Sequence, residues 1–186
     1  MDHKLFLAIK IDLDKSLQEK YFYLKKLLSQ QRVKFYTLDQ LMLVIRYLGN
    51  IPSEFISELN GLIGPIITSQ PKLLITIDGI DIYPYDVMPR VLWFRVREDK
   101  NLSAFVRKIE KIVKDFSGHE EIFAFYPHIT FARIRYMKNT KLLSKIKQFS
   151  DIEPVNIEVN YIHLIENIKT NKGNIYKTRN KFMLMD

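Results

Sequence analysis

The N-terminal part of the chain pairs a strand-like apolar run with a helical stripe. Leu5 to Ile11 is almost continuously apolar, which is typical of a strand covered on both faces. The segment Asp14 to Gln30 follows with apolar residues at helical spacing, namely Leu17, Tyr21, Leu24 and Leu28. This pattern predicts a strand followed by a helix.

Two further strands and a second helix are predicted next. Val33 to Tyr36 and Leu41 to Leu48 have strand-like apolar patterns, and Gly49 closes the second run as a turn residue would. Pro52 suits the first turn of a helix. The apolar face of that helix consists of Phe55, Ile56, Leu59, Leu62 and Ile63. We expect the pair Gly64-Pro65 to weaken or end it.

The middle of the chain predicts a strand pair and the clearest helix. Leu73 to Ile82 and Val91 to Val96 are the strands. The loop from Tyr83 to Pro89 joins them, and its prolines and aromatic residues suit a surface excursion that could flank a ligand. Asn101 to Phe116 is the helix, with a single apolar stripe formed by Leu102, Phe105, Val106, Ile109, Ile112, Val113 and Phe116.

The C-terminal part adds a strand at His128, a short helix near Thr140 to Phe149, and a hairpin. Its two strands are expected around Val155 to Ile168 and Asn174 to Leu184, with a turn containing Gly173. Because helices alternate with hairpins rather than with single parallel strands, the order predicts an α+β fold.

Composition narrows the class of protein. The 186 residues, 47% hydrophobic and 27% charged, are enough for one globular domain spanning residues 1–186. The net charge of +8 and the pI near 9.5 suit a polyanionic partner such as RNA. No cysteine is present, which excludes disulfides, thiolate metal sites and cysteine nucleophiles. The N-terminus lacks a signal-peptide pattern and no long apolar stretch occurs, so we expect a cytoplasmic protein without a membrane span.

The candidate chemistry starts at Pro127-His128-Ile129-Thr130, which places an imidazole and a hydroxyl two residues apart. On a strand this spacing points both side chains to one face. Histidine gives and takes protons near neutrality, and a hydroxyl can hold a phosphate oxygen. We therefore expect His128 and Thr130 to form half of an acid/base site for phosphodiester hydrolysis, which requires a second proton-transfer group.

The whole layout resembles the 2H phosphoesterase superfamily, and most closely its RNA 2′,3′-cyclic phosphodiesterase branch, also called 2′-5′ RNA ligases. Its first motif typically reads Leu-His-Leu-Thr-Leu-Arg-Phe-Leu-Gly, onto which Leu41-Met42-Leu43-Val44-Ile45-Arg46-Tyr47-Leu48-Gly49 falls without a gap. The second motif resembles Pro-His-x-Thr-Leu-Ala-Arg and is matched by Pro127, His128, Thr130, Ala132 and Arg133. The opening strand, the strand Arg90 to Trp93 and the closing hairpin are also similar, so the resemblance covers nearly the full chain.

The resemblance implies two pseudo-symmetric lobes of antiparallel sheet with outer helices around a central cleft. It also implies that two histidines act as base and acid on a cyclic phosphate without a metal or organic cofactor. Met42 and Val44 occupy the positions of the first histidine and threonine. A thioether cannot transfer protons, and losing a general acid or base costs on the order of 10² to 10⁴ in rate.

Substrate-binding candidates follow from the same strands. Arg46 lies four residues after Met42, so strict alternation places it on the same face, whereas Arg133 lies five residues after His128 and needs a bulge to turn inward. Tyr126 is a candidate for stacking on a base. Cations near the last hairpin could extend a positive rim for RNA: Lys169, Lys172, Lys177, Arg179 and Lys181.

Three hypotheses follow. The chain is a weakened cyclic phosphodiesterase, working through His128 with or without a relocated partner such as His3, His119 or His163. Alternatively, it is a non-catalytic module that binds RNA or nucleotide phosphate ends at the same cleft, as Met42 and Val44 favour. A third possibility is a fold that serves only protein contacts. In the first two we expect a monomer whose partners are RNA or nucleotide ends.

Overall fold

The computed structural model describes residues 2–84, 88–117, 125–171 and 173–186. Its elements in chain order are β1 (Asp2–Lys10), α1 (Lys15–Leu27), β2 (Arg32–Phe35), η1 (Leu38–Gln40), β3 (Met42–Pro52), η2 (Ser53–Phe55), α2 (Ile56–Thr68), β4 (Leu73–Tyr83), β5 (Val91–Val96), α3 (Lys100–Ser117), β6 (His128–Tyr136), α4 (Leu142–Lys147), β7 (Val155–Val159), β8 (Tyr161–Thr170) and β9 (Gly173–Met183). Of the predicted loop from Tyr83 to Pro89, the residues 85–87 lie outside the described part of the chain.

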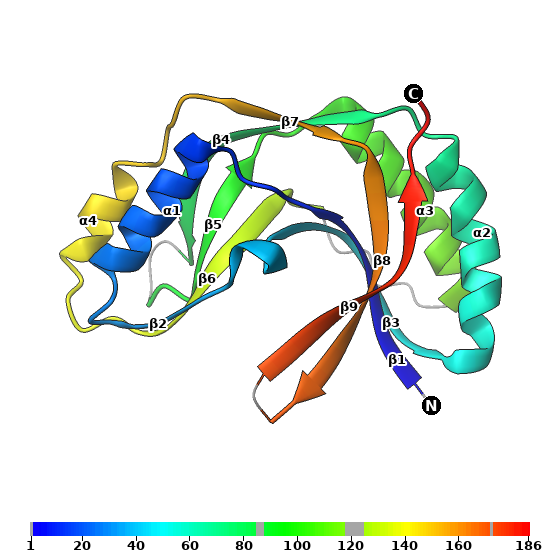
Figure 1. The fold of residues 1–186 in the computed structure, drawn as a ribbon, viewed down its shortest axis with the longest axis horizontal. Coiled ribbons are helices and arrows are strands. Elements are labelled where there is room, and N and C mark those ends of the chain that lie inside the picture. The colour runs from blue at the N-terminus through cyan, green and yellow to red at the C-terminus, as the bar shows by residue number, and fades with distance from the viewer. Residues whose placement is uncertain (1, 85–87, 118–124, 172) are drawn as a thin grey trace.

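The strands form two antiparallel sheets that face each other in an arch (Figure 1). One sheet has the order β3-β1-β8-β9, with α2 and α3 on its outer side, and the other has the order β2-β6-β5-β4-β7, with α1 and α4 on its outer side (Figure 1). The α+β class predicted from the sequence is therefore confirmed.

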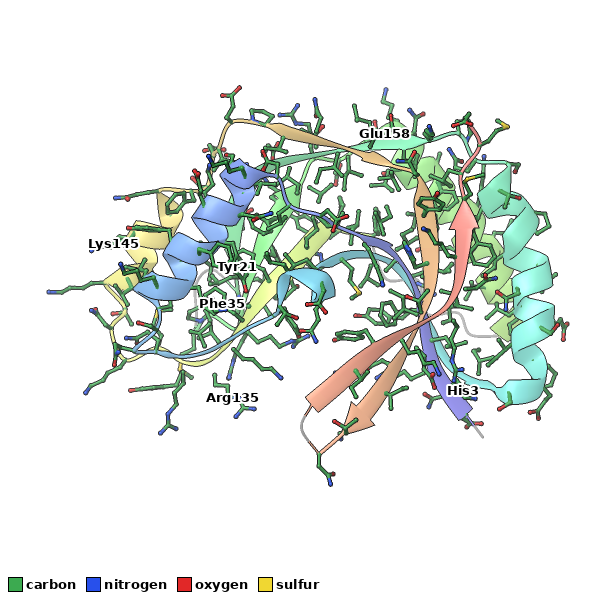
Figure 2. The ribbon with its side chains drawn as sticks, in the orientation of Figure 1. His3, Tyr21, Phe35, Arg135, Lys145 and Glu158 are labelled. Atoms are coloured by element: carbon green, nitrogen blue, oxygen red, sulfur yellow. The ribbon has the colours of Figure 1, made fainter. Side chains whose placement is uncertain are left out.

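Helices α1 and α3 cover their sheets with the apolar stripes that the sequence predicts, whereas Phe55 and Leu62 of the apolar face predicted for the second helix are exposed. On α1 the fully buried Tyr21 packs its ring edge-on against Phe35 of β2, with the ring centroids 5.7 Å apart (Figure 2). Its hydroxyl donates to the carbonyl oxygen of Tyr36 at 2.6 Å, so the polar end of this buried side chain is satisfied. No helix among the described residues is long and apolar enough to cross a membrane.

Of the two outcomes expected for the pair Gly64-Pro65, weakening or ending the second helix, the second is wrong. Helix α2 continues to Thr68 because Ile63 and Ile67 are fully buried, and the packing of this face outweighs the hydrogen bond that Pro65 cannot donate. Gly64 lies against the ring of Phe182 on β9, which lets the helix approach the sheet closely.

Two strand boundaries also differ from the prediction. Strand β3 does not stop at Gly49 but runs on to Pro52, and Gly49 adopts φ of 83° next to an irregularity in the pairing with β1. The run Val155 to Ile168 is split at Asn160, so that β7 belongs to the five-stranded sheet and β8 to the four-stranded sheet. Apolar residues continue on both sides of Asn160, which is why the pattern shows no break there.

Candidate active site

The two motif strands, β3 and β6, lie beside each other although they belong to different sheets (Figure 1). Their local geometry is the same. On β3, Val44 pairs with Ala8 and Arg46 with Leu7, so that Ile45 is an extra residue, a bulge. On β6, Thr130 pairs with Trp93 and Ala132 with Leu92, so that Phe131 is the equivalent extra residue.

These matching bulges decide which side chains face the inner side of the arch. Met42 belongs to a small cluster with Phe6, Ala8 and Ile165 that is separate from the main core. The bulged residues Ile45 and Phe131 are buried in the main core under the helices. The two strands are therefore structurally equivalent. Met42 corresponds in position to His128, Val44 to Thr130, Arg46 to Ala132 and Tyr47 to Arg133.

His128 is the proton-transfer group at the start of β6. Its Nδ1 lies 2.7 Å from the carbonyl oxygen of Tyr126, and because a carbonyl only accepts, Nδ1 carries the proton. Nε2 is then the ring nitrogen that can accept a proton from a substrate or from water. The half-buried imidazole packs against the indole of Trp93, with ring centroids 4.6 Å apart, which restricts its orientation.

Aromatic side chains surround His128. Tyr83 stacks on the indole of Trp93 with the ring centroids 5.5 Å apart and an interplanar angle of 19°. The ring of the half-exposed Tyr126 lies 5.8 Å from that of Trp93. Thr130 is half-buried and pairs directly with Trp93, so it shares the face of His128. Tyr126, His128 and Thr130 are therefore brought together, and no sequence pattern indicates that Trp93 joins them.

The first motif presents an apolar surface at the equivalent place. Met42 is nearly buried in its cluster, and Val44 packs against the same residues. Neither side chain offers a proton donor or a hydrogen-bonding hydroxyl.

The prediction that Arg46 shares the face of Met42 is wrong. The bulge at Ile45 interrupts the alternation and turns Arg46 to the helix side, where its Nη1 lies 3.7 Å from Glu110 Oε1 on α3. The residue that takes the inner position instead is Tyr47. Strict alternation cannot anticipate this because a bulge leaves no clear sequence signature.

The equivalent bulge at Phe131 turns Arg133 to the inner side of the arch. The spacing from His128 required such a bulge for Arg133 to face inward. Its Nε donates to the hydroxyl of Tyr36 at 2.8 Å. It also lies close enough to Tyr47 and Tyr176, which come from the opposite sheet, for its charge to act on both phenols. Burial raises the pKa of Tyr47 and of Tyr176, which favours the neutral phenol forms. Arg133 is thus placed where the two sheets meet.

Of the other histidines, the two that the structure describes do not lie at the first-motif position. His3 binds Glu166 on the helix side of the four-stranded sheet, at the end near the start of α2 (Figure 2). His163 pairs with Ala8 on the inner face, two strands away from Val44, which corresponds to about 10 Å. Its burial, together with the charges of Lys10 and Lys181, lowers the pKa of His163. His119 lies outside the described residues.

The predicted basic rim is not formed by all of its members. Arg179 binds Glu166, with Nη2 2.6 Å from Oε2, so its charge is already balanced. The ammonium group of Lys181 lies 3.6 Å from the ring centroid of Tyr161. Lys169 and Lys177 are at exposed positions on the hairpin, and residue 172 lies outside the described residues.

A cavity of about 620 Å³ lies on the helix side of the four-stranded sheet, away from His128. The end of β3, α2 and α3 form its walls, with Leu48, Ile51, Phe55, Leu62 and Phe116 among the lining residues. None of the predicted site residues lines this cavity. The candidate active site is therefore identified from the side chains around His128 and not from a cavity. Within the part of the chain that the structure describes, no three His, Cys, Asp or Glu side chains are grouped to hold a metal ion.

Two antiparallel sheets with outer helices, and equivalent motif strands meeting at the middle, define a protein of the 2H phosphoesterase class. The family model for the AKAP7 2′5′ RNA ligase-like domain matches residues 15–184, so the chain belongs to this family. The resemblance inferred from the two motifs is thereby confirmed.

Curated relatives are similar to the chain in sequence, and solved structures are similar to it in fold. The chain is 28% identical to an RNA 2′,3′-cyclic phosphodiesterase of Archaeoglobus fulgidus, over 94% of this chain and 96% of the relative. It is 24% identical to one of Methanocaldococcus jannaschii, over the same shares. The fold is similar to that of TT0787 of Thermus thermophilus, with a TM-score of 0.77, 19% identity and coverage of 97% of both chains. It is also similar to E. coli LigT complexed with 3′-AMP, with a TM-score of 0.75, 20% identity and coverage of 100% of both chains.

Proposed function

We propose that this protein acts on RNA or nucleotide ends that carry a 2′,3′-cyclic phosphate, and that it hydrolyses them more slowly than a protein with two motif histidines. The observation that carries the proposal is His128, whose protonated Nδ1 is fixed by a backbone carbonyl and whose Nε2 is left to act as a base. Its relatives named RNA 2′,3′-cyclic phosphodiesterases support the same substrate class.

Three residues of the second motif, and Tyr126 just before it, have a role in this proposal. His128 Nε2 removes the proton from the attacking water, and the Thr130 hydroxyl donates to a phosphate oxygen. Arg133 lies about 13 Å from His128 along the strand, so it binds the RNA backbone next to the end rather than the reacting phosphate. Tyr126 stacks on a base beside His128.

A non-catalytic binding module is the second candidate function, and one observation favours it. Met42 and Val44 pack with Phe6 and Ile165 as an apolar surface, so no imidazole stands at the first-motif position. Under this alternative, Thr130 holds a phosphate end that is not turned over, and Arg133 holds the adjoining RNA backbone.

The test is hydrolysis of a 2′,3′-cyclic mononucleotide and of an RNA ending in the cyclic phosphate, by the protein and its His128→Ala variant. We expect slow turnover that falls by at least about 100-fold in the variant, because the base is lost. Product formation is measured by chromatography. A His128→Ala variant as active as the parent protein would contradict the assignment. Binding of both ends without any turnover by either protein would favour the binding module.

A further inference from the structure

The equivalence of the two motif strands extends to their neighbouring strands and to one pair of cations. Lys10 on β1 pairs directly with Met42, and Arg95 on β5 pairs directly with His128. Directly paired residues of antiparallel strands place their Cβ atoms about 5 Å apart on the same face. Each motif position therefore has a basic side chain beside it on the inner face of the arch.

The two cations differ in what surrounds them. Arg95 is held by three carboxylates: its Nε lies 2.8 Å from Asp78, and its Nη1 and Nη2 lie 3.4 Å and 3.1 Å from Asp81 and Asp151. Its charge is therefore balanced within the protein. Lys10 is exposed, and among the described residues no carboxylate forms an ion pair with it. An anionic ligand beside Met42 therefore meets in Lys10 a cation whose charge no carboxylate of the described residues balances.

Lys10 also lies on the inner side of the sheet, because it is two residues along β1 from Ala8, which faces that side and pairs with His163 of β8. The charged and titratable groups that face it from the neighbouring strands are His163 and, beyond it, Lys181 of β9. This positive surrounding favours a phosphate. The four-carbon stem of Lys10 is long and flexible, so its ammonium group can extend beyond the apolar side chains around Met42.

We propose that Lys10 supplies the proton and the positive charge that Met42 cannot, acting together with His128 on the cyclic phosphate. The inference rests on the proposed function and names the second group of its acid/base pair. In this proposal, Lys10 of β1 performs the proton transfer that a histidine at position 42 of the adjacent strand β3 would perform. Met42 is then compatible with turnover rather than a sign of its loss.

In the proposed reaction, His128 Nε2 takes a proton from water while the water oxygen forms a new bond to phosphorus. One ribose-phosphate P–O bond breaks, and its oxygen receives a proton from the Lys10 ammonium group. The resulting amine regains a proton from solvent and the imidazolium of His128 loses one, so the net change is addition of water across one ester bond.

The test compares the protein with Lys10→Ala, Lys10→Arg and His128→Ala, using a 2′,3′-cyclic mononucleotide. We expect Lys10→Ala to lower kcat by about 100-fold or more. We expect Lys10→Arg to keep KM within about twofold but to lower kcat similarly, because a guanidinium keeps the charge but does not give up a proton. Lys4→Ala, which removes another exposed lysine of β1, is the matched control and should leave both constants unchanged.

The pH dependence of kcat separates a lysine acid from a histidine acid. Lysines ordinarily titrate near pH 10.4 and histidines near 6.5, so a lysine acid keeps the rate on a plateau above about pH 8. A fall in the rate near pH 7 would identify another histidine as the acid and overturn the inference. Full activity in Lys10→Ala, with none in His128→Ala, would overturn the inference alone, and absence of turnover in the parent protein would overturn both proposals.

Discussion

Replacing Met42 by histidine and Val44 by threonine together is expected to raise the rate of cyclic phosphate hydrolysis by about 100-fold. The two positions are structurally equivalent to His128 and Thr130, since each pair precedes the same bulge on its strand. The change thus places an imidazole and a hydroxyl where the strand geometry is already prepared. A positioned general acid or base contributes about 10²- to 10⁴-fold, and we expect the lower end because Lys10 already supplies a proton in the parent protein.

The gain comes with a moderate loss of stability. Met42 and Val44 pack with Phe6, Ala8 and Ile165, and a hydroxyl and an imidazole at these positions must lose part of their hydration. We expect the free energy of unfolding to fall by about 1 to 2 kcal/mol, which urea denaturation measures.

The double variant also provides a second test of the role of Lys10. Once an imidazole stands at position 42, Lys10→Ala should cost less than about tenfold, whereas it costs about 100-fold in the parent protein. Kinetics of the four combinations measure this coupling. A folded double variant with no gain in rate would show that position 42 does not act on the same phosphate as His128.

The sequence predicted the fold well because its strongest signals are local. The apolar run from Leu5 to Ile11, which contains the buried part of β1, and the stripe on α3 each specify one element, and the two motif strings fix the order of the strands around them. The Gly64-Pro65 pair misled the prediction because the packing of Ile63 and Ile67 on the sheet is a tertiary effect that the local pattern does not contain.

The orientation of the two arginines shows where sequence reasoning stops. Counting residues placed Arg46 inside and Arg133 outside, and one extra residue in each strand reverses both outcomes. Lys10 and Trp93 were missed for a related reason, because each reaches the site as a cross-strand neighbour of a motif residue. Such neighbours are fixed by the pairing register, which no short motif encodes.

A buried ion pair far from the site gives the largest expected effect on stability. Glu166 is only 6% exposed, and its Oε1 accepts from His3 Nδ1 at 2.6 Å. Its Oε2 accepts from Arg179 Nε at 2.7 Å. His3 in turn contacts the Ser53 hydroxyl at the start of the segment leading into α2, so the network joins β1, β8 and β9 to that helix.

We expect Glu166→Ala to lower the free energy of unfolding at pH 7 by about 3 kcal/mol, because the charge of Arg179 is left without its partner in a partly buried position. The matched control is Glu158→Ala. Glu158 is exposed at the edge strand β7 (Figure 2), and its carboxylate lies 3.7 Å from Lys72 Nζ. An exposed pair of this kind contributes little to stability because water screens both charges. Urea denaturation of the three proteins measures both effects.

Lowering the pH tests the same network, because the stability that Glu166 contributes depends on the charge of its carboxylate. Burial alone would raise the pKa of Glu166, but the hydrogen bond from His3 and the charge of Arg179 outweigh it and hold the pKa below its ordinary value. A carboxylate with a lowered pKa stabilises the fold fully above the pKa of the unfolded chain, about 4.3 for Glu, and this contribution is lost as the pH falls through the folded value. The stability gap between the parent protein and Glu166→Ala should therefore narrow below about pH 4. A gap that stays constant to pH 3 would mean that Glu166 stabilises the fold by packing rather than by its charge.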